Sequence, residues 1–208
     1  MKEDTEPTSR KEQSVKTIRL PMTLAFTLLV AAGCVPSLNP LYTEKDLVFE
    51  PALVGVWTEN DEAKDTWAFE KQGENGYRLI YTNDGKTGEF EARLLKLGGT
   101  LFLDFYPDEA GLKDLTRNDF YKSHLVPAHS FAKVMQIEPT LQMALLDPDW
   151  VKKLLEKNPG AIAHGQVAED RIVLTAPTKE LQKFVVQYAK EAFGEGEPSN
   201  LKRIKSKP

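Results

Sequence analysis

Short stretches of alternating apolar and polar residues, separated by turn residues, fill most of the chain from residue 52 onward. Residues 89–95, for example, place Phe90, Ala92 and Leu94 on one side of an extended chain and charged residues on the other. A period of two is typical of a strand with one face on a core and the other in water. The pattern therefore predicts antiparallel strands.

About eight such strands are predicted in up-and-down order. Asn83-Asp84-Gly85 is typical of a tight hairpin, because glycine readily adopts the positive φ that the turn requires. Closing eight antiparallel strands removes both edges of the sheet. We therefore expect a mainly β fold with a closed antiparallel barrel. The predicted strands cover residues 53–57, 66–69, 77–81, 89–95, 101–106, 129–137, 141–146 and 171–175.

Three other segments follow different patterns. A short helix is predicted over 148–158, where Asp147 is a good N-cap, and a second helix from Thr178 onward. Residues 107–122 are charged and lose the alternation, which predicts a solvated loop or short helix, or alternatively a lid that binds a partner. Residues 194–208 are predicted to form a polar, frayed tail.

The apolar run from Leu20 to Gly33 is the longest in the chain, and the only cysteine, Cys34, follows it directly. Arg10, Lys11, Lys16 and Arg19 precede the run and give it a positive flank. The run is shorter than the roughly 20 residues that a bilayer-spanning helix needs. The pattern favours an export signal over a permanent membrane helix.

The residues Ala31-Ala32-Gly33-Cys34 resemble the lipobox of a bacterial lipoprotein precursor. The resemblance implies a signal peptide over 1–33, acyl chains such as palmitate on Cys34, and a lipid-anchored protein of the cell envelope. Val35 resembles the pattern for sorting to the outer membrane, in a bacterium that has one. The alternative is an uncleaved anchor or an ordinary secretory signal.

Composition narrows the classes of function. The chain has 208 residues, 41% of them hydrophobic, and a formal net charge of −4. This length fits one domain, and the apolar share excludes full disorder. The acidic balance argues against nucleic-acid binding. We expect a lipidated tether over 34–50 and the barrel domain over 51–193.

Gly55-Val56-Trp57, on the first predicted strand, resembles the Gly-x-Trp signature of lipocalin-like (calycin) barrels. In that family the Trp closes one end of the barrel, and a late Arg packs across its ring. The resemblance implies that Gly55, Trp57 and Arg171 close the barrel here. An Arg guanidinium over an indole ring contributes about 0.5–2 kcal/mol.

Ten side chains are expected by alternation to point into the barrel. A hollow barrel would use them to hold a small apolar ligand, whereas a filled barrel would use them as its core. The sequence leaves both readings open. The ten are Trp67, Phe69, Tyr77, Leu79, Tyr81, Phe90, Leu94, Leu101, Leu103 and Phe105.

Catalytic and metal-binding patterns are missing from the sequence. It contains no nucleophile elbow, phosphate-binding loop or zinc-protease motif. The histidines His124, His129 and His164 form no ligand pattern, and Asp104 and Glu91 read as isolated acids. We therefore expect no enzyme, no metal and no cofactor.

The predicted function is that of a non-catalytic, lipid-anchored envelope protein that binds or sequesters a small apolar molecule in its barrel. Its partners would be the membrane, through the acyl chains on Cys34, and that ligand. The alternative is an envelope interaction or scaffold lipoprotein with a filled barrel and loops that bind a protein partner, which the sequence does not identify.

Overall fold

The computed structural model of the protein describes residues 34–59, 64–113, 115–168, 171–194 and 198–204. The chain divides into two units, 1–31 and 32–208, and the description below concerns the second. The predicted signal peptide, including Ala31, Ala32 and Gly33 of the lipobox, lies outside the described residues. Among those described, no helix has both the length and the apolar character needed to cross a bilayer.

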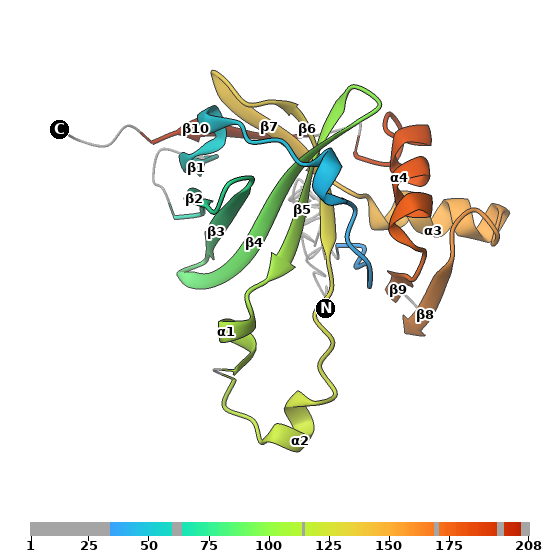
Figure 1. Ribbon diagram of the computed structural model, residues 1–208. Coiled ribbons are helices and arrows are strands. Elements are labelled where there is room, and N and C mark those ends of the chain that lie inside the picture. Colours follow the sequence, from blue (N-terminus) through green and yellow to red (C-terminus); the bar gives the residue numbers. More distant parts are fainter. Residues whose placement is uncertain (1–33, 60–63, 114, 169–170, 195–197, 205–208) are drawn as a thin grey trace, which may run out of the picture. The chain divides into compact units, whose positions relative to one another are not determined.

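Eight antiparallel strands close into a barrel in the order β1-β10-β7-β6-β5-β4-β3-β2 (Figure 1). The expected mainly β fold with a closed antiparallel barrel is therefore confirmed. Strands β1 to β7 follow one another around the barrel, as an up-and-down order requires. The barrel strands are β1 (Gly55–Thr58), β2 (Thr66–Gln72), β3 (Gly76–Asn83), β4 (Lys86–Leu97), β5 (Thr100–Pro107), β6 (Ser130–Gln136), β7 (Thr140–Leu145) and β10 (Ser199–Arg203).

The hairpin between β3 and β4 shows how local sequence sets the pairing of neighbours. Asp84 and Gly85 take φ values of 48° and 71°, and Asn83 pairs with Lys86 across the turn. Two consecutive positive φ angles twist a two-residue turn in the sense that matches paired strands. In this register Leu79 lies opposite Phe90, and both contribute to the barrel interior.

The strand that closes the barrel is not the expected one. The sequence predicts closure by residues 171–175, but β9 (Arg171–Leu174) pairs with β8 (His164–Ala168) in a separate two-stranded sheet. The barrel closes through β10, which lies in the stretch expected to be a frayed tail and pairs with both β7 and β1. Leu201 is the one apolar residue of β10 and is fully buried. One apolar position among five gives an alternation too weak to predict a strand.

Two helices cover part of the outer surface of the barrel. These are α3 (Pro148–Lys157), which Asp147 caps by accepting hydrogen bonds from two backbone amides, and α4 (Thr178–Gln187). Phe102 points outward from β5 and lies 5.5 Å, between ring centroids, from Phe193 after α4. This contact belongs to a second apolar core between the helices and the outer face of the barrel.

The N-terminal segment, residues 35–54, is not the tether predicted over 34–50. It packs along the outer face of the barrel, and Val35, Ser37 and Leu41 are buried. It contains two short 3₁₀ turns, η1 (Glu44–Asp46) and η2 (Pro51–Leu53). Its prolines interrupt any alternation, and the sign of packing in the sequence is the apolar cluster Leu47-Val48-Phe49, which was expected to pack on the barrel. Leu47 packs against the outer core, and Val48 and Phe49 pack against the inner one.

A projecting segment, residues 108–128, connects β5 to β6. It contains two short helices, α1 (Glu109–Lys113) and α2 (Asp119–Lys122). Figure 1 shows it extending away from the end of the barrel where β4 begins and β5 ends.

Candidate functional site

One end of the barrel, which we call the sealed end, is closed by Trp57 and Arg203. The Arg203 guanidinium lies 4.3 Å from the centre of the fully buried Trp57 ring. Its nitrogens donate hydrogen bonds to the backbone oxygens of Val54, at 2.6 Å, and Ala52. The Trp57 indole nitrogen donates to the Leu53 oxygen at 2.9 Å. These contacts fasten η2 across this end.

Gly55 is required for this arrangement. Its φ is 145°, a conformation that other residues rarely adopt, and a Cβ here would overlap the Arg203 guanidinium. The Gly-x-Trp pattern therefore has a local physical reason in this chain. The expected partner, Arg171, is exposed on β9, outside the barrel, so assigning barrel closure to Arg171 was wrong.

Tyr77 closes the rest of the sealed end. Its hydroxyl accepts a hydrogen bond from the Glu50 amide at 2.6 Å and donates one to the Glu50 carbonyl at 3.1 Å. Burial raises the pKa of Tyr77 to about 12. The Phe49 ring stacks on it with centroids 5.1 Å apart. The segment before η2 is thus attached to the interior as well.

The ten residues predicted to line a cavity all belong to the inner apolar cluster of the barrel. They differ in burial, and this divides the interior into two layers. The packed layer consists of buried side chains: Phe69, Tyr77, Leu79, Leu94, Leu103 and Phe105. The partly buried ones are Trp67, Tyr81 and Phe90, together with Leu101 nearer the sealed end.

The opposite end, which we call the open end, carries a group of partly buried rings. Trp67 lies 4.4 Å from Tyr81 and 5.9 Å from Phe105, measured between centroids. Burial raises the pKa of the Tyr81 hydroxyl, and the negative charges of Asp65 and Glu59 raise it further. The open end therefore combines aromatic faces with a rim of acidic groups.

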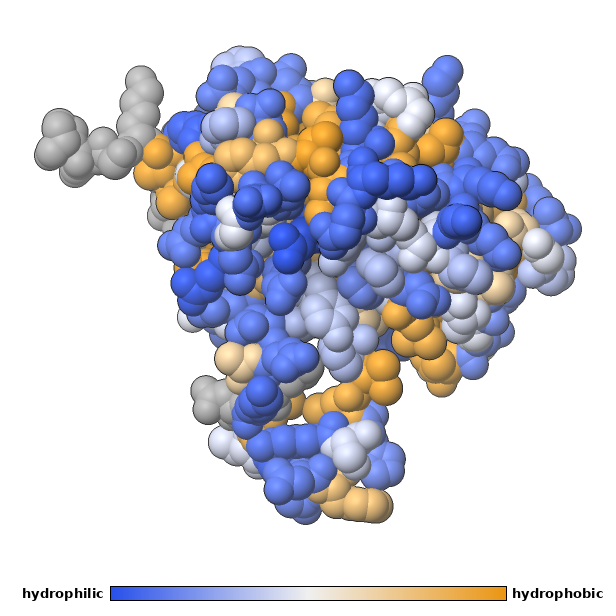
Figure 2. Space-filling view, viewed as in Figure 1, coloured by the Kyte–Doolittle hydropathy of each residue, from blue (hydrophilic) through white to orange (hydrophobic). Residues whose placement is uncertain are grey.

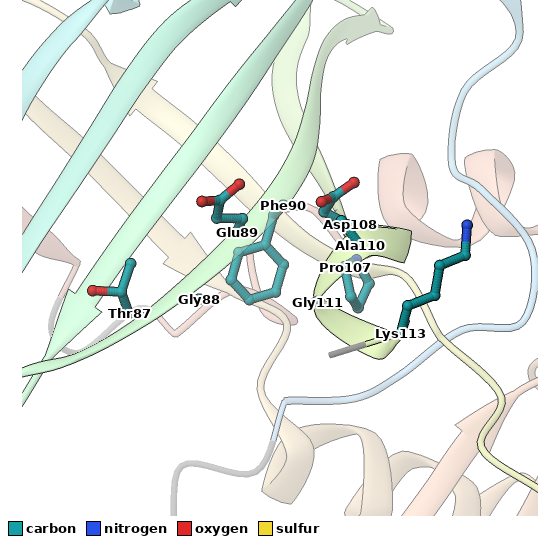
Figure 3. Close-up of a pocket in the computed structure, with 9 residues that line it drawn as sticks. All are labelled: Thr87, Gly88, Glu89, Phe90, Pro107, Asp108, Ala110, Gly111 and Lys113. Atoms are coloured by element: carbon teal, nitrogen blue, oxygen red, sulfur yellow. The ribbon is translucent and has the colours of Figure 1, made fainter. Parts of the chain in front are cut away.

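A cleft of about 810 Å³ lies at this end, between β4, β5 and α1. Figure 3 shows the Phe90 and Pro107 rings in its middle and the Lys113 side chain on its far side. Phe90 and Pro107 are paired across β4 and β5. Glu89 and Asp108 add carboxylates to the lining. An apolar floor with charged edges suits a molecule that is mainly apolar and has a polar end.

Cys34, the predicted site of lipid attachment, is exposed and is a free thiol. Ser37, three residues later, is buried, and its amide and carbonyl pair with those of His129 at 2.9 and 2.8 Å. His129 directly precedes β6, which begins at the open end. The structure thus places the predicted anchor residue near that end.

No family model, curated protein or solved structure matches this chain.

Sequence reasoning missed one buried polar cluster. Asp104, only 1% exposed, accepts a hydrogen bond from the Leu41 amide at 2.6 Å and contacts His129 Nδ1 at 2.7 Å. Asp104 was expected to be an isolated acid, and this was wrong. Phe102 and Tyr106 lie on the same face of β5 as Asp104. An acid between two aromatic residues on one face was the sign in the sequence that Asp104 is buried. The cluster joins the N-terminal segment to β5 and the start of β6.

Within the described ranges, no three His, Cys, Asp or Glu side chains are grouped so that they could hold a metal ion. Glu91, the other acid considered from the sequence, lies 3.5 Å from Arg93 in a partly exposed ion pair on the outer face.

Proposed function

We propose that this chain is a lipid-anchored protein of a bacterial cell envelope that binds a small apolar molecule at the open end of its barrel. The observation that carries the proposal is the difference between the two ends. One end is sealed by Trp57, Arg203 and Tyr77. The other presents the partly buried rings of Trp67 and Phe90 beside a cleft of about 810 Å³.

The packed layer sets the depth of the proposed site. Leu79, Leu94 and Leu103 are fully buried and belong to the same apolar core as Tyr77. A ligand therefore occupies the open end, where an acyl chain or an aromatic group would cover the exposed parts of the rings. Covering apolar surface contributes about 25 cal/mol per Å².

The lipid anchor is supported by sequence and placement together. The apolar run ends directly before Cys34, and the Cys34 side chain is exposed. Each buried methylene contributes about 0.8 kcal/mol, so two or more acyl chains on one residue hold a protein stably on a membrane. Cys34→Ser should abolish labelling of the full chain by radioactive palmitate in a bacterial host. Labelling that persists in this variant would contradict the anchor.

Ligand binding is tested on the full chain purified from its own host by native mass spectrometry. We expect a co-purified apolar molecule, and less of it in Trp67→Ala, since that ring contributes to the open end. Met135→Ala, which alters an exposed side chain on β6, is the matched control.

A ligand library extends this test. A ligand at a hundred times its Kd adds about 2.7 kcal/mol to the stability of the folded state, which a thermal melt detects. A protein that carries no molecule and gains no stability from apolar ligands would contradict the proposal. That result would favour the second candidate function, an interaction or scaffold protein with a filled barrel, which the packed layer supports.

A further inference from the structure

We infer that the open end of the barrel faces the bilayer and that the projecting segment, residues 108–128, enters the lipid headgroup region beside the anchor. The partner is the surface of the membrane that holds the chain. The inference rests on the proposed function for the attachment at Cys34. It extends that function by naming the surface that contacts lipid and the side from which the ligand enters.

Large exposed apolar side chains gather on the projecting segment. Phe120 is 78% exposed, Val126 71% and Tyr121 53%, and Leu115 and Leu125 are also exposed. Single exposed apolar residues are common, whereas several on one short segment indicate a contact surface. Figure 2 shows apolar side chains among the polar ones on this part of the molecule.

Internal hydrogen bonds fix the backbone around α2, which carries Phe120 and Tyr121. Asn118 accepts a hydrogen bond from the Tyr121 amide at 2.8 Å and so caps α2. Lys122 Nζ donates to the Lys113 carbonyl at 2.9 Å, which links α2 to α1. Ser123 Oγ donates to the Phe120 carbonyl at 2.7 Å. The segment thus pairs these polar groups with one another in exposed hydrogen bonds and leaves its aromatic rings in solvent.

The chemistry of this surface favours lipid headgroups over an apolar protein groove. The Arg117 guanidinium lies 5.9 Å from the centre of the Tyr121 ring, whereas Lys113 is paired with Glu109 at 3.7 Å. Because the segment also carries Asp108 and Asp119, its charge is mixed, and its apolar side chains make the main contact with lipid. Aromatic rings that have basic neighbours are enriched at the interface between membrane and water. The rings enter the boundary of the acyl chains, and Arg117, beside the Tyr121 ring, meets the headgroup phosphates.

The position of Cys34 places the membrane at this end. Ser37 pairs with His129, the residue at which the projecting segment joins β6. A chain spans at most about 3.5 Å per residue, so Cys34 lies within about 10 Å of Ser37. The apolar run precedes Cys34 directly, so the chain reaches the membrane here whether residues 1–33 are removed or retained.

This orientation gives the ligand a short path. The cleft beside Phe90 and Pro107 is also lined by Ala110 and Gly111 of α1, at the base of the projecting segment. An apolar molecule could therefore pass between the bilayer and the barrel interior without crossing bulk water. The ligand that fits this path is a molecule dissolved in the membrane, such as an acyl lipid.

Quenching by brominated lipids tests the inference. The full chain is produced in a bacterial host and added to phosphatidylcholine–phosphatidylglycerol vesicles with brominated acyl chains. Phe120→Trp places a reporter on the projecting segment. Met135→Trp places one on an exposed position of β6 near the sealed end. Emission is compared with that of the parent chain, which contains Trp57, Trp67 and Trp150.

We expect the added emission of Phe120→Trp to be lost in brominated vesicles and that of Met135→Trp to be retained. Equal quenching of the two, or none at position 120, would overturn the inference and leave the segment as a surface for a protein partner. The palmitate experiment is interpreted separately. If emission at position 120 is lost although Cys34 carries no palmitate, the membrane surface is supported and the lipidation is rejected. If Cys34 carries palmitate but emission at position 120 is retained, the lipidation is supported and the membrane surface is rejected.

Discussion

Arg203 shows how one side chain connects three parts of the chain. It contacts the Trp57 ring and donates hydrogen bonds to Val54 and Ala52. Hydrogen bonds from a charged group contribute about 1.5–3 kcal/mol and a cation–π contact about 0.5–2 kcal/mol. Arg203→Ala should therefore lower the free energy of unfolding in urea by about 2–4 kcal/mol.

Arg171→Ala is the matched control, because Arg171 is exposed and lies outside the barrel. Its effect should stay within about 0.5 kcal/mol. Equal destabilisation by the two substitutions would show that the contacts of Arg203 at the sealed end do not stabilise the fold.

Tyr77 makes the stability of the fold depend on alkaline pH. Its pKa in the folded protein is about 12, above the ordinary value of 10.0, because burial disfavours the phenolate. The neutral phenol therefore contributes its full stability below pH 10, and this contribution is lost as the pH rises toward 12. Tyr77→Phe should lower the free energy of unfolding near neutral pH by about 1–3 kcal/mol, because Glu50 loses two hydrogen bonds.

The measurement is urea unfolding of the parent and of Tyr77→Phe across that alkaline range. The difference between the two proteins isolates Tyr77 from the other tyrosines and should shrink as the pH rises. A difference that is constant across the range would show that Tyr77 does not titrate in this way.

At the scale of elements, β10 decides whether the sheet is closed. It lies between β7 and β1, and without it both strands would have an unpaired edge. Exposed edges template pairing with other chains. A chain that ends after Gly194 should therefore aggregate and lose its cooperative thermal transition, as measured by size-exclusion chromatography and a thermal melt.

Removal of residues 205–208 alone is the control, because it deletes no described contact. That chain should stay monodisperse and melt as the parent does. A truncation after Gly194 that melted like this control would mean that the barrel is stable without its eighth strand.

Alternation identified the strands of the barrel only where several apolar residues share one face. It therefore recovered β1 to β7, whose inward faces carry aromatic and aliphatic side chains. It could not identify β10, which has one apolar residue, or separate β9 from the barrel. A short alternating stretch shows that a strand forms but not which strand it pairs with.

At the scale of the whole molecule, Asp104 connects the N-terminal segment, and with it the proposed anchor residue Cys34, to the open end. Its carboxylate binds both the Leu41 amide and His129. Asp104→Ala leaves these buried partners unsatisfied and should cost about 1.5–3 kcal/mol. Hydrogen exchange should become faster at the Leu41 amide and at Ser37.

His124→Ala, on the projecting segment, is the comparison for this effect, since its ring contacts only that segment in the described contacts. It should leave exchange at Leu41 unchanged. Unchanged exchange in Asp104→Ala would instead show that packing of Val35 and Leu41 alone positions the segment.

By itself the sequence determined the mainly β fold, the inward set of ten side chains, the cap at Asp147 and the hypothesis of an anchor at Cys34. Each of these depends on residues that are close together along the chain, through alternation, turn chemistry or a short motif. Only the tertiary structure decided that Arg203 covers Trp57, that Ser37 pairs with His129, and that Cys34, the proposed anchor residue, lies at the same end as the projecting segment. These contacts join positions far apart in sequence, and no local pattern specifies which distant partner a side chain will meet.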